Sequence, residues 1–131
     1  MKASELRIGN WFKEDILEQT FAQITAEQIL DFYDDPLDDF YQPIPLTEEW
    51  LLKLRFDKLR EYNDGENIII EYGKSIIVGD NSHIEKLVIT FPFNHCEIGS
   101  YRSEDAYILN TTINYVHQLQ NLYFALTREE L

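Results

Sequence analysis

The sequence predicts an α+β fold in which an antiparallel sheet carries two helices and follows a small β-rich N-terminal segment. Three observations predict it: a capped helix start after Pro45, Ile- and Val-rich runs with short connections in the middle, and a helical apolar stripe towards the C-terminus. With 131 residues, 44% of them hydrophobic, the chain can form one domain with its own core. We expect residues 1–45 to form an acidic β-rich segment and 46–131 a helix–sheet–helix core.

The N-terminal segment is expected to begin with a strand over Leu6–Phe12, which Gly9 and Asn10 interrupt. Ile16–Tyr33 is open to either a helix or strands. Its first apolar residues have helical spacing, but the later ones do not continue that face. Two short strands that divide near Thr25 fit the same residues, and we favour strands here.

The most clearly marked element is a short helix over Glu48–Arg55. Thr47 is a good N-cap because its hydroxyl can accept a hydrogen bond from a first-turn N–H, and two glutamates follow it where the helix dipole favours negative charge. Leu46 and Leu51 have the spacing of a hydrophobic staple. The expected helix end is surrounded by four cations, Lys53, Arg55, Lys58 and Arg60.

The stretch from Leu59 to Ile98 is typical of strands. The three runs richest in Ile and Val are Asn67–Tyr72, Ser75–Val78 and Ile84–Phe91, which are separated by Gly73-Lys74 and by Gly79-Asp80-Asn81. Short connections favour an antiparallel meander, because parallel neighbours need a longer crossover.

A second helix is expected over Asn114–Leu126. One stripe holds its apolar residues, Val116, Leu119, Leu122, Tyr123 and Leu126, while His117, Gln118 and Asn121 fall elsewhere. Thr127 and Glu130 have capping-box spacing, and Leu126 and Leu131 have staple spacing, so we expect at most one further helical turn.

Three stretches carry a family resemblance: Glu5–Trp11 (ELRIGNW), Pro43–Lys53 (PIPLTEEWLLK), and Tyr115–Thr127 (YVHQLQNLYFALT) followed by Glu-Glu-Leu. Together they resemble a family of small uncharacterised proteins of Bacteroides-type bacteria and their phages and mobile elements. The resemblance implies a mobile-element setting and no catalytic residues. Such relatives often have glycine where this chain has Arg55 and Arg128, which weakens the expectation of glycine C-caps here.

Charge is concentrated in one part of the chain. The net charge is −13, and the stretch from Glu14 to Leu52 contains eleven acidic residues and no Lys or Arg. A protein of this charge should be repelled by nucleic-acid backbones and anionic membranes, and should attract a basic partner. We therefore expect neither direct nucleic-acid binding nor membrane binding.

The function predicted from these residues is non-enzymatic protein–protein binding. Asp34–Pro45 is expected to be a loop, because it holds three prolines and four aspartates. Aromatic residues beside acidic ones are typical of a protein interface. The predicted partner-binding residues are Asp31, Tyr33, Asp34, Asp35, Asp38, Asp39, Phe40 and Tyr41. Further aromatic candidates for this surface are Trp11, Trp50 and Phe32, although core packing is favoured for Trp50.

Two other functions are compatible with the same residues. The aspartates could imitate a phosphate backbone and inhibit a DNA- or RNA-binding protein. An enzyme could use carboxylates or Cys96, although adjacent strand residues point in opposite directions and His95 therefore does not suit it as a base. The EF-hand spacing, paired metal-ligand motifs and a glycine-rich phosphate loop are all absent from the sequence. We expect no metal and no cofactor.

The expected compartment is the cytoplasm. The first eleven residues lack the apolar core of a secretory signal, and no apolar run approaches the roughly 20 residues needed to span a bilayer. The chain has a single cysteine and so cannot form an internal disulfide.

Overall fold

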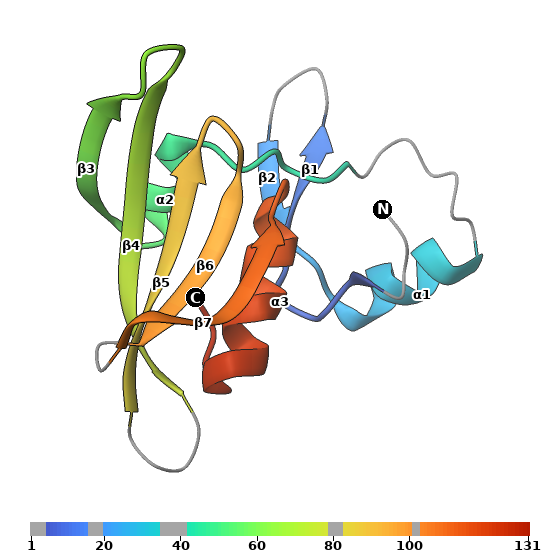
Figure 1. The fold of residues 1–131 in the computed structure, drawn as a ribbon. Helices are drawn as coiled ribbons and strands as arrows, with labels where there is room; N and C mark the ends of the chain where they lie inside the picture. The colour runs from blue at the N-terminus through green and yellow to red at the C-terminus, as the bar shows by residue number, and fades with distance from the viewer. Residues whose placement is uncertain (1–4, 16–19, 35–41, 79–82, 101–102) are drawn as a thin grey trace.

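Two antiparallel sheets and three helices make up the fold (Figure 1). The computed structural model describes residues 5–15, 20–34, 42–78, 83–100 and 103–131. The elements are β1 (Trp11–Asp15), β2 (Thr20–Gln23), α1 (Ala26–Asp34), α2 (Glu48–Lys53), β3 (Asp57–Asn63), β4 (Ile68–Val78), β5 (His83–Phe91), β6 (His95–Ser100), β7 (Ser103–Thr112) and α3 (Val116–Thr127). Strands β3 to β7 pair in sequence order, and β1 pairs with β2. The predicted α+β class and antiparallel meander are confirmed.

The main core lies between the five-stranded sheet and the helices α2 and α3, which cover the same face of the sheet (Figure 1). Alternate residues of each strand point to this face. Tyr72 of β4 and Ile89 of β5 are paired neighbours on it, and both are fully buried. The main core contains Ile44, Leu46, Trp50, Leu51, Leu54, Phe56, Tyr72, Ile76, Leu87, Ile89, Cys96, Ile98, Ile113, Val116, Leu119 and Tyr123. On edge strand β3, Arg60 forms an exposed two-bond ion pair with Glu71 of β4.

Strand β4 runs without a break through Gly73, where the sequence had suggested a boundary between two strands. The expectation of a break was wrong because this glycine serves packing and not a turn. A Cβ atom at position 73 would lie 2.6 Å from Cδ1 of Leu59, so any other residue here would require that side chain to move. Leu59 belongs to β3, which pairs with β4 at this point.

Helix α2 begins as the sequence predicted. Trp50 N–H donates to Thr47 Oγ1 over 3.4 Å, and both leucines of the predicted staple are buried. The helix ends at Lys53, two residues earlier than expected, because Arg55 adopts a left-handed φ of 66° and stops it. The expected cations Lys58 and Arg60 belong to β3 and not to the helix end.

The described part of the N-terminal segment contains two strands and a helix, where the sequence predicted three strands. Thr20–Gln23 is a strand, but the stretch from Ala26 to Asp34 is helix α1, so the preference for strands was wrong there. The physical reason is a local cap. Gln28 N–H donates to Thr25 Oγ1, and Thr25 N–H donates to Gln28 Oε1, a reciprocal capping box that starts the helix.

A second, smaller cluster of apolar residues supports this segment. Leu6, Phe12 and Ile24 are buried together, with Ala22 and Ile29 packed against them. This N-terminal cluster is separate from the main core. Helix α1 therefore rests on a few side chains at the end of the molecule remote from the main sheet (Figure 1).

Helix α3 has two buried sides, and the sequence predicted only one of them. Val116, Leu119 and Tyr123 of the predicted stripe pack into the main core. His117 and Gln120, which the stripe excluded, are each only 1% exposed. They lie on a second side of α3, which contacts β1. The helix is thus covered by the sheet on one side and by the N-terminal segment on another (Figure 1).

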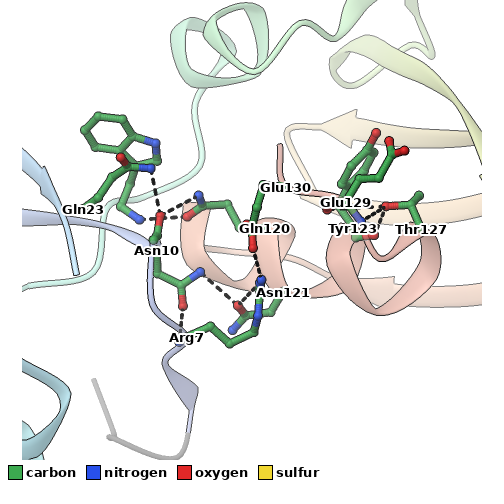
Figure 2. Close-up of polar contacts among 11 residues, drawn as sticks. Arg7, Asn10, Gln23, Gln120, Asn121, Tyr123, Thr127, Glu129 and Glu130 are labelled. Carbon is green, nitrogen blue, oxygen red and sulfur yellow. Dashed lines mark hydrogen bonds and ion pairs between the residues drawn. The ribbon is translucent and has the colours of Figure 1, made fainter. Parts of the chain in front are cut away.

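Amide side chains of α3 hold the N-terminal segment in place (Figure 2). Gln120 accepts a hydrogen bond from Trp11 N–H over 2.8 Å and donates to the Gly9 carbonyl over 3.3 Å. Asn121 Oδ1 accepts from Asn10 Nδ2 over 2.9 Å and from the Arg7 guanidinium over 3.2 Å. We call these residues, Arg7, Gly9, Asn10, Trp11, Gln120 and Asn121, the amide clasp.

The described residues after α3 form no further helical turn, which is compatible with the expectation of at most one. Thr127 is the last residue of the helix, and its hydroxyl donates to the Tyr123 carbonyl over 2.8 Å. Glu130 does not complete a capping box with Thr127, because its carboxylate forms an ion pair with Arg7. Arg128 ends α3 with a left-handed φ of 61°. None of the helices in the described residues is both long and apolar enough to cross a membrane.

Candidate binding site

The structure describes only part of the predicted acidic partner-binding surface. Asp31 and Tyr33 lie on α1 and are exposed, and Asp34 is the last residue of that helix. The other predicted residues, Asp35, Asp38, Asp39, Phe40 and Tyr41, lie outside the described residues. Three of the predicted residues are therefore placed on α1, and two of them, Asp31 and Tyr33, have exposed side chains.

Helix α1 exposes apolar side chains together with acidic ones. Leu30 is 64% exposed and Tyr33 is 78% exposed, at an i, i+3 spacing that puts them on neighbouring turns of one face. Glu27 and Asp31 are exposed beside them. Ile29 packs the opposite side of the helix against the N-terminal cluster. The outward face of α1 is thus a small apolar surface within an acidic surround.

A second surface lies where the β1–β2 hairpin, α2 and β4 meet. It contains a hollow of about 480 Å³, which is within the usual size range of ligand sites. The hollow is lined by Trp11, Gln23, Trp50, Lys53, Leu54, Arg55, Lys74, Glu130 and Leu131. A smaller hollow of about 210 Å³ adjoins it and is lined by Phe21, Ile44, Pro45, Thr47, Glu49, Trp50 and Lys53. Because Trp50 and Lys53 line both hollows, we treat the pair as one basic groove.

Aromatic rings form the floor of the basic groove. The ring centroids of Trp11 and Trp50 are 5.7 Å apart, and Phe21 meets Trp50 edge-on at 5.3 Å. The Lys53 ammonium lies 4.6 Å from the Trp50 ring and 5.5 Å from the Trp11 ring, within the range of cation–π attraction. Two segments distant in the sequence, β1 and α2, are joined by these contacts.

Three cations border the larger hollow. Lys74 donates to the Leu54 carbonyl over 3.3 Å, while Lys53 and Arg55 come from the end of α2. Burial and the nearby Arg55 guanidinium lower the pKa of Lys74, and Asp57 opposes this shift only in part. Lys74 and Arg55 therefore lie close enough for their positive charges to repel each other.

Sequence reasoning did not find the basic groove. Trp50 was expected in the core, and it does belong there, but one side of its ring also lines both hollows. The available signal was local: Trp50 and Lys53 are three residues apart on a helix, the spacing at which a cation can lie over a ring. Lys74 and Trp11 gave no such signal, because only the fold brings them to α2.

The side chain of Cys96 is not suited to nucleophilic catalysis. It is fully buried in the main core, and burial, followed by the Glu97 carboxylate, raises the pKa of its thiol to about 12. Cys96 therefore remains a protonated thiol at neutral pH. His95 points to the other face of β6, where its Nδ1 lies 3.1 Å from Glu97. Geometry thus supports the expectation that these neighbours do not form a catalytic pair.

His117 is the buried titratable group closest to the amide clasp. Its ring stacks on Tyr115 with centroids 5.8 Å apart, and within the described residues neither ring nitrogen has a hydrogen-bond partner. Burial lowers the pKa of His117 below its ordinary value of 6.5, although the Glu5 carboxylate opposes the shift. His117 is therefore neutral in the folded protein at neutral pH.

We expect acid to destabilise the protein through His117. The unfolded chain takes up this proton near pH 6.5, whereas the folded chain resists it, so stability is lost as the pH falls below about 6.5. Thermal unfolding at pH 7.5 and pH 5.0 checks this expectation. His117→Phe, which keeps an aromatic ring on Tyr115, should show a smaller drop between the two pH values than the unmodified protein. An equal drop would contradict it.

Among the described parts of the chain, no group of three or more His, Cys, Asp or Glu side chains is placed to hold a metal ion. Comparison of the chain with family models, curated proteins and solved structures finds no match. The candidate sites therefore depend on geometry and charge alone.

Proposed function

We propose that the protein is a non-enzymatic protein-binding module that presents α1 to a basic partner. The observation that carries this proposal is the outward face of α1, where Leu30 and Tyr33 are largely exposed beside Asp31. Exposed apolar side chains within a charged surround are typical of interaction surfaces. An apolar contact of this kind gives affinity, and the acidic surround selects the partner.

The charge distribution supports a basic partner. The stretch from Glu14 to Leu52, which contains α1, has eleven acidic residues and no basic ones. Such a concentration speeds the encounter with a positively charged surface and repels nucleic acid and anionic lipid. The resemblance to phage and mobile-element proteins suggests a partner met in the cytoplasm of a bacterial host.

The proposal predicts that α1 variants lose the partner. Replacing both Leu30 and Tyr33 with serine should reduce capture of the partner from host lysate about tenfold or more, because two apolar anchors are lost. The measurement is quantitative mass spectrometry of tagged pull-downs. Ile77→Ser is the matched control, since Ile77 is 59% exposed on β4 and far from α1 in the chain.

Salt and charge variants separate this function from inhibition by nucleic-acid mimicry. Replacing Asp34, Asp35, Asp38 and Asp39 with asparagine should only weaken an α1 interface, and high salt should leave part of the binding intact. A nucleic-acid mimic would no longer capture its target enzyme, either as the asparagine variant or in high salt. Equal capture by the serine variant and the Ile77→Ser control would exclude α1 as the interface.

A further inference from the structure

The basic groove and the face of α1 are different surfaces, and they suit partners of opposite charge. Of the eleven Lys and Arg residues of the chain, three border the larger hollow, namely Lys53, Arg55 and Lys74. We propose that the basic groove binds an extended acidic peptide segment of a partner protein. In this arrangement the carboxylates of the segment lie beside the three cations, and a neighbouring apolar side chain rests against Phe21.

The side-chain carboxylates of Glu130 and Glu49 also line the groove, and their positions favour one direction of the bound segment. Glu130 in the larger hollow is paired with Arg7, so it leaves the three cations available. Glu49 lines the smaller hollow together with Phe21, Ile44 and Pro45. A ligand carboxylate is therefore disfavoured in the smaller hollow, while an apolar side chain is favoured there.

The shape of the groove favours a peptide over a compact ligand. Its two hollows lie side by side and share Trp50 and Lys53, so an occupant that fills both must be elongated. The rings of Trp11, Trp50 and Phe21 offer apolar surface along this length, with the planes of the two tryptophans tilted by 55° and Phe21 edge-on to Trp50. Large aromatic residues bordered by charge are the usual centre of a protein-binding surface.

The charge of the whole molecule argues against a nucleic acid in the groove. A strand long enough to stack on the three rings would bring several phosphates, and a net charge of −13 repels such a polyanion. A short peptide with three or four carboxylates lies close to the cations and meets less of this repulsion, since charges more than about 8 to 10 Å apart are screened in physiological salt.

The two tryptophans make binding directly measurable. The chain has only two, Trp11 and Trp50, and both line the larger hollow, so its tryptophan emission reports on occupation. The probe is a synthetic, terminally blocked peptide of sequence Asp-Glu-Asp-Glu-Leu-Phe, which contains no tryptophan. The control peptide is Asn-Gln-Asn-Gln-Leu-Phe, and fifteen-nucleotide oligothymidylate tests nucleic acid. Isothermal titration calorimetry at two salt concentrations gives affinities.

The left-handed arginines supply a matched pair of variants. Arg55 borders the groove and Arg128 does not, yet both have a positive φ, so glycine relieves backbone strain at either position. Both Arg55→Gly and Arg128→Gly should raise the thermal unfolding midpoint. Only Arg55→Gly should weaken binding of the acidic peptide, by about fivefold, the effect of one exposed charge pair.

The expected result is a saturable change in tryptophan emission with the acidic peptide, weakened by salt and by Arg55→Gly and absent with the neutral peptide. The proposal is overturned if neither emission nor heat changes, if the neutral peptide binds equally, if both glycine variants bind alike, or if oligothymidylate binds more tightly. Because none of these variants changes α1, a negative result for the groove leaves the proposed function of α1 unaffected. A negative result for α1 likewise leaves the groove proposal unaffected.

Discussion

Phe12→Ala is expected to lower the stability of the N-terminal segment by about 4 kcal/mol, the usual cost of truncating a fully buried phenylalanine. Phe12 is 0% exposed, and among the described residues Leu6 and Ile24 are buried together with it. Removal of its ring leaves a cavity in this cluster, which lowers the stability of the segment that the cluster supports. The β1–β2 hairpin and α1 should therefore open while the main sheet stays folded.

Hydrogen exchange read by mass spectrometry checks this expectation. Amides of β1, β2 and α1 should lose protection in Phe12→Ala, while those of β4 and β5 keep theirs. Ile8→Ala is the control, because Ile8 lies in the same segment but is 63% exposed. Loss of protection throughout the sheet would mean that the two clusters unfold as one unit, contrary to the expectation.

Gln120→Leu should destabilise the protein by about 2 to 3 kcal/mol, although leucine is a better helix former of similar size. The substitution removes the hydrogen-bond partner of Trp11 N–H, whereas the Gly9 carbonyl keeps the bond that Gln23 Nε2 donates to it over 3.1 Å. Leaving the Trp11 N–H without a partner costs more than the added apolar contact returns.

Urea unfolding measures this change in the free energy of unfolding. The readout is tryptophan fluorescence, which comes from Trp11 and Trp50. Ala125→Leu is a suitable control, since Ala125 is an exposed position on the same helix. A change below about 0.5 kcal/mol in Gln120→Leu would show that water replaces the lost amide, and that the amide clasp contributes little to stability.

The parts of the fold that depend on short-range rules were predictable. The start of α2 follows from Thr47 and its two glutamates, and the antiparallel order of the central strands follows from their short connections. The start of α1 was equally local, since Thr25 and Gln28 have capping-box spacing. Its apolar pattern was ambiguous, however, and the preference for strands ignored the cap.

The parts set by tertiary contacts were not predictable. The glycine in β4 resembles a turn in the sequence, and only the position of Leu59 shows why it stays within a strand. The apolar stripe of α3 left out His117 and did not include Gln120, yet a second layer of chain covers both. The basic groove draws Trp11, Lys53 and Lys74 from three elements, and no spacing in the sequence connects them.

The amide clasp has a consequence for synthesis on the ribosome. Its hydrogen bonds connect residues more than 100 positions apart, such as Trp11 with Gln120. The N-terminal segment is synthesised 109 residues ahead of its partner Gln120. Trp11 and the neighbouring backbone groups therefore lack these hydrogen bonds until α3 has been made, and during that time chaperones can reach them. A chain truncated before Val116 would lack α3, so these groups of the N-terminal segment would never gain their hydrogen-bond partners.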